Sequence, residues 1–68
     1  MTDDTITPDR LRLAGWDDRF ACFTREGREG DFWVILVAGA WLWCGIGGPT
    51  KLTGMADVAA RLATMPPV

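Results

Sequence analysis

The chain has no histidine, tyrosine, serine, asparagine or glutamine among its 68 residues. Histidine is the usual general base, serine is the commonest hydroxyl nucleophile, and side-chain amides supply donors to oxyanion holes. Most hydrolytic chemistry is therefore excluded. A zinc site would have to be built from two cysteines and carboxylates without imidazole, unlike the Cys/His sets that structural zinc prefers. We expect no enzyme activity, no metal and no cofactor.

Long apolar segments and an excess of positive charge are also missing. The longest apolar run, residues 32–44, covers thirteen positions, well short of the ~20 residues that a membrane-spanning helix needs. The N-terminus is acidic where a secretory signal would be basic, so we expect a cytoplasmic protein. Nine acidic and seven basic residues give a net charge of −2, which provides no positive field for a nucleic-acid backbone.

The length and composition fit one small globular domain. The apolar fraction of 49% and the charged fraction of 24% are those of a folded chain, although 68 residues lie near the lower limit for independent folding. We expect a flexible lead-in at residues 1–6, a single α+β domain at residues 7–65 and a short tail at residues 66–68.

A short helix is predicted directly after the lead-in. Thr7 is placed to cap it, and Pro8 suits the first helical position because its missing N–H costs nothing there. Gly15 can adopt the left-handed conformation that ends a helix, which would turn Trp16 back onto Leu11.

A second helix is predicted near the C-terminal end. Apolar residues recur at helical spacing from Met55 to Met65, and Thr53 is placed to cap the helix. Asp57 and Arg61 lie four residues apart, so they can pair on the solvent face.

The segment between the helices is predicted to form a three-stranded antiparallel meander. Its strands are expected at residues 19–24, 32–37 and 41–45, after a turn at Asp17-Asp18. Residues 25–31 form an exposed hairpin loop, residues 38–40 a turn, and residues 46–49 a flexible exit. The run 32–44 also fits one long strand or a buried helix, but its β-branched residues and Gly39 argue against the helix.

The two cysteines, Cys22 and Cys44, allow two interpretations. A bridge between them would close a loop of about 23 residues and stabilise the fold by roughly 3 kcal/mol. Two reduced, buried thiols are the favoured interpretation for a cytosolic chain. A redox role is disfavoured because neither cysteine has a CxxC neighbour or a histidine to lower its pKa.

The predicted strands are apolar on both faces, which is unusual when helices cover only one. Alternation places Trp33, Ile35 and Val37 on one face of the sheet and Phe32, Val34 and Leu36 on the other. In the next strand it likewise places Trp41 and Trp43 on one face and Leu42 and Cys44 on the other. Three interpretations follow: both faces belong to the core, one face binds a second copy of the chain, or one face binds a different protein.

Candidate partner-binding residues are of two kinds. Carboxylates in the expected turns are either simply solvated or present negative charge to a basic groove, although the interleaved arginines weaken the second idea. Tryptophans are typical of interface hot spots. The candidates are Asp17, Asp18, Glu26, Glu29, Asp31, Trp33, Trp41 and Trp43.

The chain resembles small accessory proteins of phages and mobile elements, including anti-CRISPR proteins. The resemblance is carried by the opening Thr7-Pro8-Asp9-Arg10-Leu11 with Gly15-Trp16, the charged loop and the helix-meander-helix order. It is one of build over residues 7–65, without a diagnostic motif. It implies a stoichiometric inhibitor that binds a surface of a Cas effector, often where DNA would lie.

Two functional hypotheses follow. The first is a non-catalytic inhibitor that occludes a surface of a larger protein or ribonucleoprotein complex, such as a Cas effector, through a salt-sensitive contact with a basic partner. The second is a homo-oligomeric accessory subunit that buries its second sheet face against a copy of itself.

Overall fold

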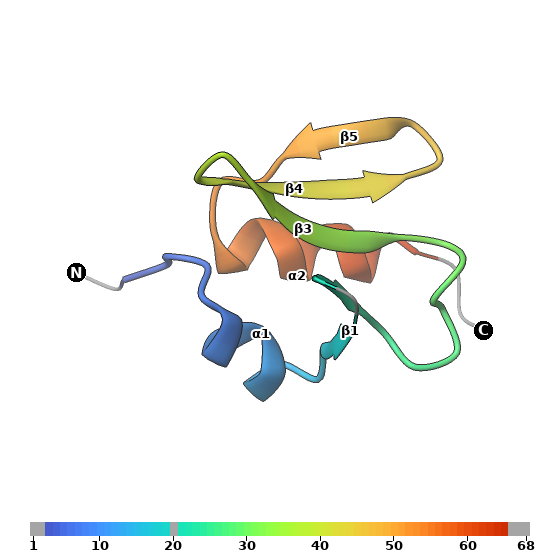
Figure 1. Ribbon diagram of the computed structural model, residues 1–68, viewed down its shortest axis with the longest axis horizontal. Helices are drawn as coiled ribbons and strands as arrows, with labels where there is room; N and C mark the ends of the chain where they lie inside the picture. Colours follow the sequence, from blue (N-terminus) through green and yellow to red (C-terminus); the bar gives the residue numbers. More distant parts are fainter. Residues whose placement is uncertain (1–2, 20, 66–68) are drawn as a thin grey trace.

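The computed structural model describes residues 3–19 and 21–65 and shows an α+β fold (Figure 1). Its helices are α1 (Pro8–Leu13) and α2 (Met55–Ala63). Between them lie β1 (Asp17–Arg19), β2 (Cys22–Thr24), β3 (Trp33–Val37), β4 (Ala40–Gly45) and β5 (Gly48–Lys51). The five strands form one antiparallel sheet in chain order, β1-β2-β3-β4-β5.

The sheet has five strands where the sequence predicts three. The expected strand at residues 19–24 is divided into parts of β1 and β2, with Ala21 in the left-handed conformation between them (φ 66°). Asp17 and Asp18, expected in a turn, belong to β1. The expected exit at residues 46–49 runs into β5, where an edge position tolerates Pro49 because its missing N–H is not needed by a further strand.

The hairpin of β3 and β4 confirms the predicted turn at residues 38–40. Ala38 and Gly39 both have positive φ, 51° and 80°, as a two-residue turn between twisted strands requires. Val37 pairs with Ala40 directly beside the turn. One long strand and a buried helix, the other interpretations of this run, are therefore wrong.

The ends of α1 are as the sequence predicts. The Thr7 hydroxyl accepts a hydrogen bond from the Arg10 backbone N–H at 3.1 Å. Gly15 is left-handed (φ 98°), and the Trp16 N–H donates to the Leu11 carbonyl at 2.9 Å. Leu11 and Trp16 are both buried, so the short helix is fixed by packing at its C-terminal end.

The predicted cap of α2 is wrong. Gly54, not Thr53, is the N-cap residue, and it has no side chain to offer. The cap comes from the other end of the chain, because the Asp4 carboxylate accepts from the Ala56 N–H at 3.1 Å and the Asp4 carbonyl accepts from the Met55 N–H at 2.9 Å. The predicted pair of Asp57 and Arg61 is confirmed at 3.0 Å.

Both helices pack on one face of the sheet, called here the inner face, and the opposite side is the outer face. Figure 1 shows α2 running beside β3 and β4, with α1 near β1. Residues 3–6 of the predicted lead-in lie on the same side, since Ile6 is in the core. Residues 1–2 and the expected tail at 66–68 lie outside the described residues. The buried apolar core is Ile6, Leu11, Trp16, Phe23, Phe32, Val34, Trp43, Leu52 and Val58.

Candidate interaction surface

The outer face carries an apolar row that crosses all five strands. Cys22 pairs with Ile35, and Ile35 pairs with Leu42. Arg19 extends this row at β1 and Lys51 extends it at β5. Side chains directly opposite each other share a face of a sheet, so an apolar centre on this face ends in a positive charge at both edges.

A second row lies beside the first. Trp33 pairs with Cys44, which pairs with Pro49 of β5, and Asp17 pairs with Thr24 at the other edge. Trp33 keeps 37% of its surface exposed, whereas Thr24 is buried and its hydroxyl has no hydrogen-bond partner among the described residues. The two rows give a continuous apolar strip that includes an exposed indole.

Neither α1 nor α2 covers this strip. Leu11 of α1 and Val58 of α2 both belong to the inner-face core, and Asp4 of the lead-in bonds to α2. The helices therefore do not lie on opposite faces of the sheet, and residues 3–6 do not fold over the outer face. Exposed apolar strips of this kind mark interfaces more often than isolated apolar side chains do.

The three candidate tryptophans do not lie together. Trp33 is on the outer face, as its alternation with Val34 predicts, whereas Trp43 is only 4% exposed and stacks on Phe32 with ring centroids 4.9 Å apart. Trp41 packs against the same core and contacts Phe23. Trp33 alone of the three is placed for a partner on the outer face.

Two of the candidate carboxylates are held by arginines. Asp18 pairs with Arg12 at 3.3 Å, and Asp31 pairs with Arg28 at 2.7 Å. These pairs lower the net negative charge that either carboxylate can present to a basic groove.

The other three candidate carboxylates are exposed. The pKa of Glu29 is lowered by hydrogen bonds from its own backbone N–H and that of Gly27, and by the charge of Arg19. Glu26 is exposed in the loop between β2 and β3, and Asp17 is exposed at the sheet edge. Glu26 and Glu29 thus share one loop, whereas Asp17 lies on an edge strand.

The two thiols are separate on the outer face. Cys22 and Cys44 are free, and β3 runs between their strands. Two strand spacings place them roughly 10 Å apart, beyond the ~7 Å between Cα atoms that a disulfide spans. The interpretation as a bridged pair is wrong for this fold.

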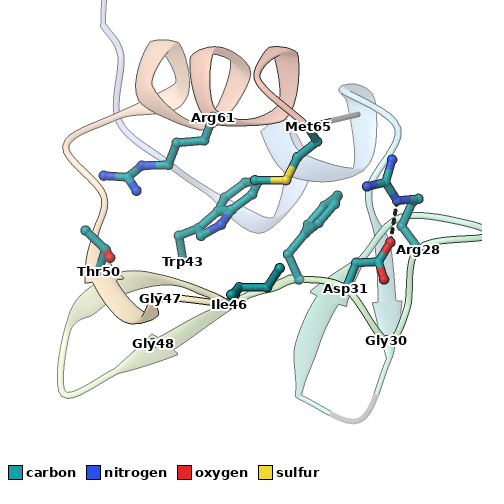
Figure 2. Close-up of a pocket in the computed structure, with 12 residues that line it drawn as sticks. Arg28, Gly30, Asp31, Trp43, Ile46, Gly47, Gly48, Thr50, Arg61 and Met65 are labelled. Carbon is teal, nitrogen blue, oxygen red and sulfur yellow. Dashed lines mark hydrogen bonds and ion pairs between the residues drawn. The ribbon is translucent and has the colours of Figure 1, made fainter. Parts of the chain in front are cut away.

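A pocket of about 490 Å³ opens on the other side of the molecule, and the sequence analysis did not predict it (Figure 2). The stacked rings of Phe32 and Trp43 line it, together with Met65 and the fully exposed Ile46. Arg61 and Thr50 lie at one end, and Arg28 and Asp31 at the other. The sequence signal was Ile46 between glycines, a large apolar side chain in what was interpreted as a flexible exit.

Residues 3–19 and 21–65 contain no group of three or more His, Cys, Asp or Glu side chains that could hold a metal ion. No helix in this part of the chain has the length and apolar character needed to cross a membrane.

Comparisons with known proteins identify no relative. No family model matches the chain, and neither a curated protein nor a solved structure matches it.

Proposed function

We propose that this chain is a non-catalytic protein-binding module that acts as a homodimer, in which the outer faces of two copies pack together. The observation that carries the proposal is an apolar strip that neither helix covers, formed by the exposed Trp33 with the half-buried Ile35 and Leu42, which ends in charged residues. Sheets pack face to face through strips of this kind in β-sandwiches.

The charges at the β1 edge favour a second copy as the occupant. Asp17 and Arg19 are two residues apart, so they share the outer face, and neither forms an ion pair with another described residue. A two-fold axis in the plane between the sheets and perpendicular to the strands brings Asp17 of each copy over Arg19 of the other. The same axis places Trp33 of each copy over Ile35 of the other. Each apolar row then faces the other row of the second copy, so the face is complementary to itself.

The edges of the sheet do not favour pairing by strand addition. β1 has three charged residues, and β5 carries Pro49 and Lys51. Charges and proline on edge strands oppose pairing with another chain. Association through the face is therefore preferred.

The expected dimer is weak. Five strands about 4.8 Å apart, each contributing roughly two outward residues, give a footprint of about 300 Å². A standard interface buries about 800 Å² per partner, so we expect a dimer that dissociates on dilution.

The inhibitor hypothesis remains a separate proposal with less support. It relies on carboxylates that engage a basic partner, and Asp18 and Asp31 are already paired with arginines. It predicts a monomer whose Trp33 face stays exposed until a larger basic protein binds.

Sedimentation equilibrium over a wide concentration range tests the homodimer. Ile35→Lys places a charge in the centre of the strip and should leave only monomer. Leu13→Lys is the matched control, because Leu13 is exposed on α1, away from the sheet, and it should dimerise as the parent does.

Charge exchange tests the orientation of the two copies. Asp17→Arg alone should weaken the dimer by placing like charges together, and adding Arg19→Asp should restore it because opposite charges face each other again. A parent chain that stays monomeric at the highest concentration would exclude the homodimer and direct the search to a different protein.

A further inference from the structure

We propose that the pocket beside Trp43 binds an apolar monocarboxylate, with its apolar body along the Phe32 and Trp43 side and its carboxylate toward Arg61 and Thr50 (Figure 2). The pocket lies on the inner-face side, so this binding site is separate from the proposed dimer surface. Its volume of about 490 Å³ is within the range of small-ligand sites.

The apolar part of the pocket is rigid on one side and open on the other. Phe32 and Trp43 are both almost fully buried, and Trp16 meets each of their rings edge-on at 5.8 and 5.7 Å. Ile46 on the rim is fully exposed. The apolar part of a ligand would therefore lie between the exposed Ile46 and the preformed aromatic rings. Binding would then require little loss of side-chain conformational entropy.

The polar end of the pocket offers donors. The Arg61 Nε donates to the Asp57 carboxylate at 3.0 Å, while its terminal N–H groups have no acceptor among the described residues. The Nε1–H of Trp43 likewise has no acceptor among the described residues, and it lies beside Gly45 on the pocket wall. Thr50 adds an exposed hydroxyl.

These donors favour a head group that only accepts hydrogen bonds. Asp57 is occupied by Arg61 and by the backbone N–H of Thr53, and Asp31 is occupied by Arg28. A ligand amine at the Arg61 end would place a second positive charge and further donors beside a guanidinium that is itself a donor. An ionised carboxylate has acceptors only, and it matches the planar guanidinium of Arg61.

The position of Gly45 is consistent with a need for access to the indole. A Cβ atom at residue 45 would lie 3.2 Å from Trp43 Nε1. Gly45→Ala should therefore crowd the N–H donor and displace the indole slightly.

Titration by ¹H–¹⁵N NMR tests the proposal with three probes that share one chain: octanoate, octanol and octylammonium. We expect octanoate to shift the Trp43 indole N–H and the Arg61 side chain in a saturable manner. Octanol should bind about tenfold more weakly, since a hydrogen bond to a charged group is worth at least that factor. Octylammonium should bind least.

Arg61→Met keeps the apolar stem of the side chain and removes its donors. It should reduce octanoate affinity about tenfold and abolish the preference over octanol, while the dispersion of the spectrum reports that the fold is intact. Arg12→Met is the matched control, because Arg12 is also paired with a carboxylate but does not line the pocket. Shifts that grow linearly without saturation, equal binding of the three probes, or an unchanged preference in Arg61→Met would each overturn the proposal.

Discussion

Removing the Asp4 carboxylate should destabilise a helix that begins fifty residues later in the chain. Asp4 accepts from the first free N–H groups of α2, at 3.1 Å from its side chain and 2.9 Å from its carbonyl. Asp4→Ala deletes the side-chain acceptor only. Loss of a helix N-cap costs about 1 kcal/mol, and loss of a negative charge near the helix N-terminus adds about 0.3–1 kcal/mol.

That cost is large for this chain. A domain of this size has a free energy of unfolding of about 3–10 kcal/mol, so Asp4→Ala should remove a substantial part of it. We expect a loss of about 1–2 kcal/mol, seen as a lower urea midpoint with an unchanged slope. Tryptophan fluorescence is a suitable signal because Trp16 and Trp43 are buried.

Two variants control this experiment. Asp4→Asn keeps the acceptor and should lose much less stability, whereas Glu26→Ala removes an exposed carboxylate and should change the midpoint little. Gly54→Ala tests the same contact by crowding, because its Cβ would lie 2.8 Å from the Asp4 carbonyl oxygen. If Asp4→Ala unfolds at the parent's midpoint, the cap contributes nothing and the account of α2 is refuted.

Three further predictions concern single groups. Thr24→Val should raise the free energy of unfolding by about 1 kcal/mol, because it removes a buried hydroxyl that has no partner in the described part of the chain; a less stable variant in urea unfolding would contradict this. The backbone N–H of Thr53, followed by Arg61, holds the pKa of Asp57 below its usual range, so its stabilising contribution is complete above about pH 4 and is lost as pH falls through the folded-state pKa. Asp57→Asn should therefore flatten the loss of stability in acid, and an equal acid dependence in both proteins would refute the assignment. Mild oxidation should form no bridge between Cys22 and Cys44 within one chain, so a monomer with an internal disulfide in mass spectrometry would count against the strand order.

The features that the sequence predicts correctly depend on neighbours in the chain. Thr7 and Gly15 act within one helical turn, and the alternation through β3 depends only on adjacent residues. Alternation also correctly separates Trp33 from Trp43. It cannot tell which of the two faces the helices cover, and that choice places Trp43 in the core.

The features that sequence reasoning misses depend on exceptions to local rules or on distant contacts. Ala21 takes a left-handed conformation that usually calls for glycine or asparagine, so the turn between β1 and β2 has no signal. Pro49 normally argues against a strand but is tolerated at the edge. The cap of α2 comes from Asp4, which no local pattern connects to Ala56.

The order of the strands also has a consequence for the folding pathway. Each strand pairs with the next one in the chain, so the hairpins close short loops, which is entropically cheap and fast. The hydrogen bond between Asp4 and Ala56 spans 52 residues, more than any other hydrogen bond among the described residues. We therefore expect Asp4→Ala to accelerate unfolding in stopped-flow experiments and to leave the refolding rate nearly unchanged. The segment that comes first in the sequence would then be the last to take its place.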